Sequence, residues 1–162
     1  IRASITGHLV LSTIHTNDAA STVTRLVDMG IEPYLVSSSV VGIIAQRLVR
    51  KICPRCKESY KPSHAEAMQL KMREPQPLFR GAGCPECNYS GYKGRTAIHE
   101  ILVVTREIRE LIDRRATTDQ IRTIAIRQGT TTLMDTCIKL VLEGVTTTAE
   151  MMKVTYTVDE SA

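Results

Sequence analysis

The chain has 162 residues, of which 43% are hydrophobic, and it contains no tryptophan and one phenylalanine. This size bounds the protein at one ordinary domain, or one domain with a small appendage, around an aliphatic core. The net charge of +4 is modest, and the longest nearly apolar run, residues 40–45, is far too short to form a transmembrane helix. Because no secretory signal pattern opens the sequence, we expect a reducing cytoplasmic setting.

The beginning of the chain predicts a strand followed by a polar segment. Residues 8–13 are partly β-branched and follow Gly7, which favours a buried strand. The polar residues 14–18 come directly after it. In open α/β sheets, ligands bind at the carboxyl ends of strands, so this segment is a candidate binding site.

Two helices and a second strand are predicted next. Asp18 can cap a helix that ends near Gly30, and Pro33 suits the first turn of the following helix. Residues 41–50 mix β-branched side chains with arginines and predict a strand. That strand leads directly into a pair of cysteines.

Two Cys-x2-Cys pairs, 27 residues apart, form the most specific motif in the sequence. Each pair places two thiols on one tight turn, and two such turns facing each other make the four-thiolate cage that suits Zn²⁺. The predicted ligands are Cys53, Cys56, Cys84 and Cys87. Disulfides, redox chemistry and an iron site are alternatives that the spacing leaves open. Cys137 lies in a helical apolar pattern and is interpreted as a small core residue.

The segment between the cysteine pairs is rich in lysine, arginine and proline, so we expect it to have no core of its own and the metal to substitute for one. Residues 64–72 predict a short helix within it. Residues 95–104 predict a strand that leaves the metal unit. The sequence therefore predicts a zinc module inserted between two strands of the main body.

The last third of the chain has helical periodicity. Thr117-x-x-Gln120 and Thr147-x-x-Glu150 are capping boxes, in which a side chain and a backbone amide satisfy each other at a helix N-terminus. Four short amphipathic helices are predicted from residue 105 onward. We expect them to form a small bundle packed on the sheet.

Two familiar hydrolase motifs are missing. His99-Glu100 lacks the second histidine of the zinc-protease pattern, and no Gly-x-Ser-x-Gly elbow occurs. A histidine on a strand is usually a structural residue, but His15 stands among hydroxyl and carboxylate side chains where a phosphate or acyl substrate would lie.

Several stretches together form a specific pattern: residues 6–19, 25–30 and 45–50, both cysteine pairs, residues 91–95 and the C-terminal helices. This pattern resembles the ATPases that drive type II secretion and type IV pilus assembly, and residues 6–19 look like the histidine box of that family. The tetracysteine insert resembles the assembly and secretion branch rather than the pilus-retraction motors. Thr130 and residues 155–162 depart from the family pattern.

The resemblance implies an α/β fold: the C-terminal portion of a RecA-like P-loop ATPase domain with the zinc insert and a C-terminal helical bundle. It implies a homohexamer that binds ATP and Mg²⁺ at subunit interfaces, with His15 as a hydrogen-bond donor to the γ-phosphate. The residues that it assigns to the histidine box or to the strand beside it are His8, His15, Thr13, Thr16, Gln46 and Arg47. The implied segments are a partial ATPase core (1–52), the zinc insert (53–90), a return strand (91–104) and a helical subdomain (105–162).

No Gly-x4-Gly-Lys-[Ser/Thr] loop occurs in the sequence, and its first residue is Ile1. We therefore expect a piece of a longer chain that does not hydrolyse ATP alone, although the parent protein does. The alternatives are a zinc-dependent nucleic-acid-binding module, which we consider the weaker reading because the aromatic residues show no stacking pattern, and a zinc scaffold without motor activity.

Basic residues gather around the first cysteine pair. We expect this basic patch to contact an acidic surface, such as an inner-membrane platform protein or a neighbouring subunit, in a protein that is cytoplasmic and peripheral to the bacterial inner membrane. The basic patch consists of Arg47, Arg50, Lys51, Arg55, Lys57 and Lys61.

Overall fold

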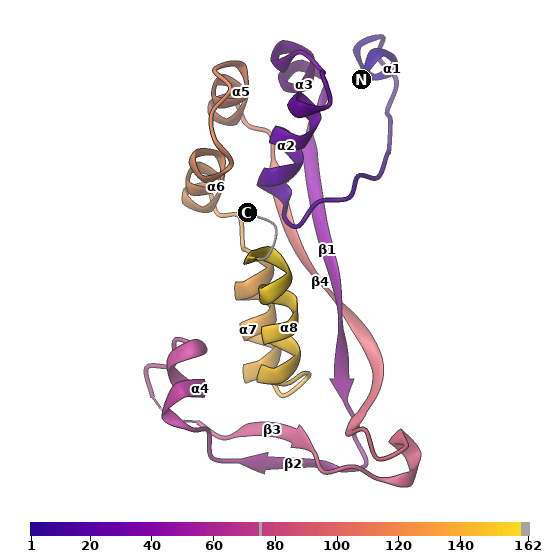
Figure 1. The fold of residues 1–162 in the computed structure, drawn as a ribbon, viewed down its shortest axis with the longest axis vertical. Coiled ribbons are helices and arrows are strands. Elements are labelled where there is room, and N and C mark those ends of the chain that lie inside the picture. The colour runs from indigo at the N-terminus through magenta and orange to yellow at the C-terminus, as the bar shows by residue number, and fades with distance from the viewer. Residues whose placement is uncertain (75, 160–162) are drawn as a thin grey trace. The chain divides into compact units, whose positions relative to one another are not determined.

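The computed structural model describes residues 1–74 and 76–159 (Figure 1). They divide into two compact units. Unit 1 contains Ile1–Gln46 and His99–Thr132, and unit 2 contains Arg47–Ile98 and Leu133–Ala162. Each unit is therefore built from two separate stretches of the chain.

Unit 1 is mainly helical. Its helices are α1 (Arg2–Ile5), α2 (Ala19–Asp28), α3 (Pro33–Ser39), α5 (Arg106–Asp113) and α6 (Thr118–Arg127). Helix α3 packs against α5, and α6 packs against both α2 and α5. Two helices from each of its two stretches, α2 and α3 from the first and α5 and α6 from the second, thus form the body of unit 1.

The helix boundaries in unit 1 follow the local signals in the sequence. The Asp18 carboxylate accepts a hydrogen bond from the backbone N–H of Ser21 at 2.7 Å, and α2 stops before Gly30, whose positive φ only glycine adopts readily. Pro33 occupies the first turn of α3. The Thr117 and Gln120 side chains complete the predicted capping box of α6. These predictions are confirmed.

The core of unit 1 is aliphatic, as the composition predicted. Small residues of α2 allow close packing against the last residues of β4 and the apolar faces of α5 and α6. The buried cluster consists of Ala19, Ala20, Val23, Val36, Leu102, Val104, Ile108, Ile112, Ile121 and Ala125.

The predicted strand at residues 8–13 is wrong. Residues 8–16 have no regular secondary structure, and Leu9 and Leu11 are 85% and 89% exposed. A strand requires a hydrogen-bonded neighbour, and the sheets formed by the described residues contain only β1 paired with β4 and β2 paired with β3. The apolar pattern is present, but this part of the chain supplies no pairing strand for it.

Two long strands connect the two units. Strand β1 (Gly42–Ile52) pairs with β4 (Tyr92–Val103), and each strand begins in one unit and ends in the other. Both strands were predicted, at residues 41–50 and 95–104. The insert begins where β1 ends and returns to the body through β4.

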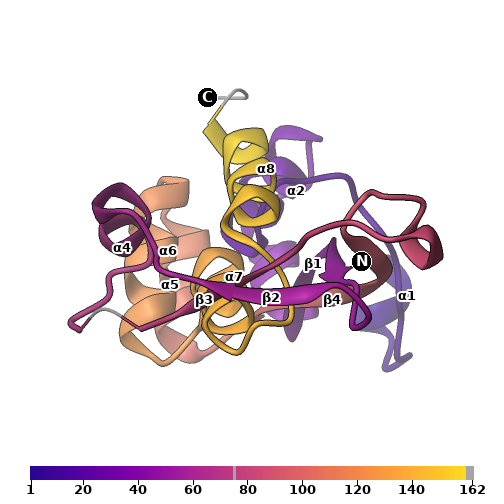
Figure 2. The ribbon, with the colours of Figure 1, turned by 90° about the horizontal axis from the view of Figure 1, so that it is seen from below.

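Unit 2 combines the insert with the last two helices (Figure 2). Its elements, besides the strand ends and one short turn, are β2 (Lys57–Tyr60), α4 (His64–Gln69), β3 (Leu78–Gly81), α7 (Leu133–Leu142) and α8 (Thr148–Asp159). Strands β2 and β3 are antiparallel, with Lys57 opposite Gly81 and Tyr60 opposite Leu78. The hairpin was not predicted, whereas α4, α7 and α8 were.

The insert contributes to a buried apolar region. Leu70 and Leu78 are only 2% and 1% exposed, and β3 contacts α7, which in turn packs against α8. The sequence predicted that the insert has no core of its own, and the structure places the insert in one unit with α7 and α8. The contact of β3, which contains Leu78, with α7, about 60 positions further along the chain, was not predicted. Cys137 of α7 is fully buried, as predicted.

The four predicted C-terminal helices divide evenly between the units, with α5 and α6 in unit 1 and α7 and α8 in unit 2. Among the described residues, no helix is both long enough and apolar enough to cross a lipid bilayer.

Candidate metal centre and histidine segment

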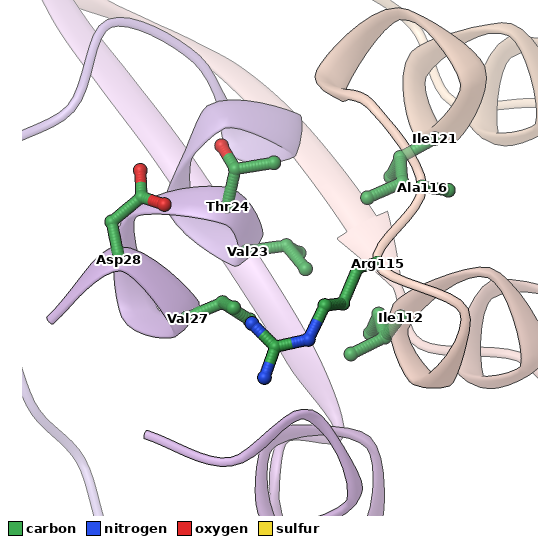
Figure 3. Close-up of a pocket in the computed structure, with 8 residues that line it drawn as sticks. All are labelled: Val23, Thr24, Val27, Asp28, Ile112, Arg115, Ala116 and Ile121. Atoms are coloured by element: carbon green, nitrogen blue, oxygen red, sulfur yellow. The ribbon is translucent and has the colours of Figure 1, made fainter. Parts of the chain in front are cut away.

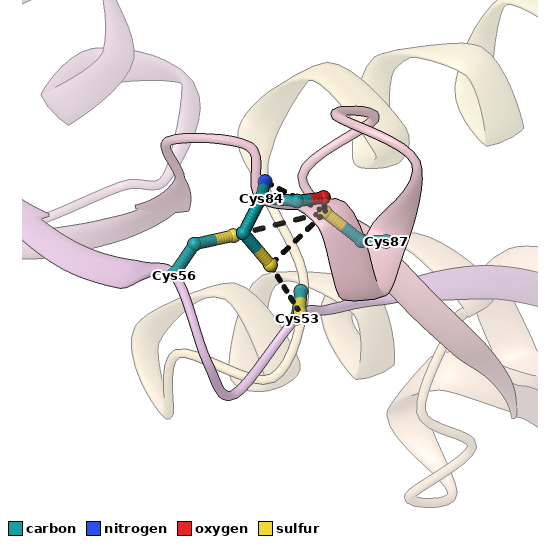
Figure 4. A group of neighbouring side chains, drawn as sticks. All are labelled: Cys53, Cys56, Cys84 and Cys87. Carbon is teal, nitrogen blue, oxygen red and sulfur yellow. Dashed lines mark hydrogen bonds between the residues drawn. The ribbon is translucent and has the colours of Figure 1, made fainter.

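The four predicted zinc ligands lie together in unit 2. Cys53 and Cys56 occupy the tight turn after β1, where the N–H of Cys56 donates to the carbonyl of Cys53. Cys84 and Cys87 occupy a second turn, built on the short 3-10 helix Pro85–Cys87. The four sulfur atoms lie within 4.8 Å of one another, and their side chains converge from the two turns (Figure 4).

The distances between the sulfurs match a metal cage. The Sγ atoms of Cys53 and Cys84 are 3.9 Å apart, those of Cys56 and Cys87 are 3.9 Å apart, and those of Cys84 and Cys87 are 3.7 Å apart. A tetrahedron with Zn–S bonds of about 2.3 Å has S···S edges of roughly 3.8 Å. Disulfide sulfurs would be bonded at about 2.05 Å, so these distances fit four ligands around one metal ion.

Backbone contacts hold the two turns together. The N–H of Cys53 donates to the carbonyl of Gly91, and the N–H of Ala82 donates to the carbonyl of Cys56, both at 2.9 Å. Gly81 and Gly91 approach so closely that a Cβ on Gly81 would lie 2.1 Å from the Gly91 carbonyl oxygen. The chain needs glycine at this crossing, because only a bare backbone lets the turns meet.

Backbone N–H groups also point at the sulfurs. The N–H of Gly83 lies 3.3 Å from the Cys56 sulfur, and that of Cys84 lies 3.2 Å from the Cys87 sulfur. Burial acts to raise the pKa of the Cys87 thiol, but N–H donation from Cys84 and Gly91 outweighs it and lowers that pKa to about 6. Burial and the neighbouring thiols raise the pKa of Cys56 to about 12. The neighbouring thiols therefore differ in how readily they lose a proton, and a divalent cation that bound all four sulfurs would displace the protons that remain.

Charged side chains surround the second cysteine turn. Glu86 accepts from Arg55 at 3.0 Å and from Lys93 at 3.1 Å. The hydrogen bond to Glu86, followed by the negative charge of that carboxylate, raises the pKa of Lys93. The side chains of Arg55, Lys93 and Glu86 are all substantially exposed, so we expect these ion pairs to contribute little to the stability of the fold.

An ion pair that sequence reasoning missed joins β1 to α8 inside unit 2. The carboxylate of Glu150 accepts from the guanidinium of Arg50 at 2.7 Å and from the backbone N–H of Arg50 at 3.1 Å. The Arg50 guanidinium also lies 4.0 Å from the centre of the Tyr92 ring. Glu150 was predicted as half of a capping box with Thr147. The Thr147 hydroxyl does accept a hydrogen bond from the backbone N–H of Glu150, but the Glu150 carboxylate binds Arg50 instead of completing the capping box.

The histidine segment, residues 8–18, belongs to unit 1. His8 and His15 are exposed, and His8 Nδ1 lies 3.1 Å from the hydroxyl of Thr6. Thr13 is also exposed. Thr16 is half-buried, and its hydroxyl lies 2.7 Å from the hydroxyl of Thr22 at the start of α2. Neither histidine is a core residue of unit 1.

The remaining two predicted residues follow each other on β1. Gln46 is exposed and Arg47 is half-buried. Gln46 is the last residue of the first stretch of unit 1, and Arg47 is the first residue of unit 2.

Two carboxylates and one arginine anchor the end of the histidine segment. Asp18 binds the guanidinium of Arg122 from α6 at 2.7 Å, and the buried carboxylate of Glu100 from β4 accepts from the Ala19 N–H at 2.9 Å. Burial acts to raise the pKa of Asp18, but the Ser21 N–H and Arg122 lower it below its usual value. These contacts span about 80 to 100 sequence positions, so no local motif indicated them.

The sequence matches a known family along most of its length. Residues 1–153 match the family model described as "Type II/IV secretion system protein". The chain belongs to this family.

Individual proteins with names also match the sequence. The chain is 48% identical over 157 residues to the "Type II secretion system ATPase E" of Vibrio cholerae, covering 96% of this chain and 31% of that protein. It is 44% identical to the "Type IV pilus assembly ATPase PilB" of Thermus thermophilus, covering 93% of this chain and 17% of that protein. The chain thus spans a third or less of the length of these two relatives.

A solved structure has a similar fold. The crystal structure of the pilus retraction motor PilT with bound ADP matches with a TM-score of 0.60 and 25% identity, over 94% of this chain and 34% of that chain. The match to part of PilT, together with the four-cysteine cluster, confirms the predicted fold class of this family member.

The family member's basic patch is partly engaged within unit 2. Arg50 pairs with Glu150, Arg55 pairs with Glu86, and the Lys57 ammonium lies 4.3 Å from the centre of the Phe79 ring. Arg50, Arg55 and Lys57 therefore have partners inside the same unit. Their charge is less available to an external partner than the sequence suggested.

A half-open pocket of about 250 Å³ lies beside α2 in unit 1 (Figure 3). Its walls are mostly apolar, and the side chains of Asp28 and Arg115 are its charged members. The lining residues are Val23, Thr24, Val27, Asp28, Ile112, Arg115, Ala116 and Ile121. It contains none of the predicted site residues.

Proposed function

We propose that this chain is the C-terminal part of a cytoplasmic hexameric ATPase that powers type II protein secretion or type IV pilus assembly. The observation that carries this proposal is the 48% identity, over nearly the whole chain, to a protein named as a type II secretion ATPase. The identity to a pilus assembly ATPase supports the second alternative equally well. The chemistry belongs to the whole motor, of which this chain is a minor part.

We propose that Cys53, Cys56, Cys84 and Cys87 hold one structural zinc ion. Four thiolates at tetrahedral spacing form a closed site with no open position for a substrate, so the ion would stabilise the fold of unit 2. Burial raises the pKa of Cys137 to about 11 and keeps it protonated in the core, away from this chemistry.

Elemental analysis tests the zinc proposal. We expect one zinc per chain in the wild type and in Cys137→Ser, and loss of zinc in Cys56→Ser. Wild-type protein without metal, or loss of metal from the Cys137→Ser control, would contradict the assignment.

In the intact motor, we propose that the histidine segment faces the nucleotide. ATP and Mg²⁺ would supply the reacting phosphoryl group and neutralise its charge. His15 would donate a hydrogen bond to a phosphate oxygen, His8, Thr13 and Thr16 would shape the segment, and Gln46 and Arg47 would relay its state along β1. The exposure of His8 and His15 supports this role, because neither histidine is used in packing unit 1.

His15→Ala in the intact protein tests this role. We expect turnover to fall by about 10-fold or more while ATP affinity and the unfolding temperature stay close to wild type, because the side chain is exposed. The matched control is His64→Ala, another exposed histidine, at the start of α4 in unit 2. Parallel loss of stability and turnover in His15→Ala would indicate a structural histidine instead.

We further propose that the motor assembles as a homohexamer on the cytoplasmic side of the bacterial inner membrane and contacts platform proteins there. The support is family membership and the positive charge of the basic patch.

A further inference from the structure

The histidine segment ends in a residue with two separate tasks. Asp18 is the N-cap of α2, and its side chain is 8% exposed. One carboxylate oxygen accepts from the Ser21 N–H at 2.7 Å, and the other accepts from the Arg122 guanidinium at 2.7 Å. The first contact is local to α2. The second connects the segment to a helix 104 positions away.

Arg122 is itself fixed in place on α6. Its second guanidinium nitrogen donates to Asp119, one turn earlier in the same helix, at 2.6 Å. A guanidinium held by two carboxylates has little rotational freedom, because its donors are planar and rigidly spaced. The position of α6 is thereby imposed on Asp18.

A second buried group acts on the next residue of the chain. Glu100 of β4 is 7% exposed and accepts from the Ala19 N–H at 2.9 Å. The first turn of α2 is therefore held between a carboxylate from β4 and an arginine from α6. His15 lies three residues before Asp18, so a displacement of Asp18 or Ala19 would also move the backbone of His15.

Apolar packing is less complete along the later turns of α2. The pocket in Figure 3 opens there, lined by Val23 and Val27 on one side and Ile112 and Ile121 on the other. Where α2 and α6 meet, the Thr24 and Thr118 hydroxyls add a further polar contact at 3.0 Å. The first turn of α2 is itself closely packed, with Ala19 and Ala20 buried in the core, so its position is set by this packing together with the polar contacts to Arg122 and Glu100.

We propose that Arg122 is a positioning residue of the ATPase: it couples α6 to the histidine segment, so that the position of α6 determines the placement of His15. This inference rests on the proposed function of the intact motor. It predicts that loss of Arg122 loosens residues 15–22 and lowers catalytic turnover without changing nucleotide binding.

Hydrogen exchange tests the coupling independently of activity. In Arg122→Met, we expect the amides of residues 15–22 to exchange about tenfold faster than in the wild type, with partial rescue by Arg122→Lys, which keeps the charge but loses the planar fork. Arg127→Met is the matched control, since Arg127 is on the same helix and pairs with Glu107. Equal exchange in the wild type and Arg122→Met would overturn the proposal.

Steady-state kinetics of the intact ATPase separate positioning from binding. We expect kcat of Arg122→Met to fall by about 10- to 100-fold while KM for ATP changes by about twofold or less, with Arg127→Met unchanged. Normal kcat in Arg122→Met, beside an active wild type, would overturn this inference alone. A wild-type protein without turnover would instead overturn the proposed function on which it rests.

Discussion

Replacing Glu150 by glutamine should remove a strong polar contact of unit 2 with little change in shape. The Glu150 side chain is 8% exposed. The hydrogen bond from the Arg50 guanidinium lowers the pKa of Glu150 from 4.5 to about 2; burial opposes this shift, and the hydrogen bond from the Arg50 backbone N–H adds to it. That difference corresponds to about 3 kcal/mol at neutral pH. Because the Arg50 side chain is 39% exposed and solvent screens its charge, we expect the variant to lose about 1–3 kcal/mol.

The pH dependence has a definite sign. A carboxyl group whose pKa is lower in the folded state stabilises the fold above its unfolded pKa of 4.5, and this contribution disappears as the pH falls toward 2. Urea unfolding of the wild type and Glu150→Gln should therefore differ by about 1–3 kcal/mol at pH 7, and this difference should shrink as the pH falls below 4. Comparing the two proteins at each pH cancels the release of metal by acid.

Glu143→Gln is the matched control, because Glu143 lies next to α7 and is exposed. It should unfold like the wild type. Equal stability of Glu150→Gln and the wild type at pH 7, or a difference that persists unchanged at low pH, would refute the electrostatic reasoning.

Three further predictions address the metal, a helix cap and the basic patch. Zinc affinity measured by chelator competition should fall by about tenfold or more per unit decrease in pH below neutrality, since Cys56 and its neighbours must lose protons to bind metal; a pH-independent affinity would contradict thiolate ligation. Thr117→Ala should destabilise the protein by about 0.5–2 kcal/mol in thermal unfolding, because it removes the cap of α6, and an unchanged melting temperature would count against that role. Lys51→Glu with Lys57→Glu should weaken binding to platform proteins more at low than at high salt, whereas unchanged pull-down at low salt would argue against a docking patch.

Features with local causes could be predicted from the sequence. Helix α6 was predicted from the capping box between Thr117 and Gln120 and from the apolar residues that follow it at helical spacing. The cysteine cage was predictable for the same reason, because the spacing within each pair determines one turn. Only the meeting of the two turns required long-range structure, and the duplication of the motif indicated that meeting.

Features that depend on distant partners could not be predicted. Arg50 meets Glu150 and Asp18 meets Arg122 across 100 or more positions, and nothing near either residue identifies its partner. The β2–β3 hairpin escaped prediction because β2 is charged and exposed, without an apolar alternation. Residues 8–13 carry a strand pattern, yet a pattern forms a strand only where another strand is available to pair.

We propose that this chain belongs to an ATPase motor whose phosphate-binding and Mg²⁺-binding residues lie outside residues 1–162. Phosphate release in the presence of ATP and Mg²⁺ tests it most directly, for residues 1–162 alone and for the intact protein that contains them. We predict turnover by the intact protein and none by residues 1–162, because the sequence contains no Gly-x4-Gly-Lys-[Ser/Thr] loop and loss of a single electrostatic contact can already cost about 10²–10³-fold in rate. Magnesium-dependent turnover by residues 1–162 alone, or an intact protein without turnover, would contradict the claim.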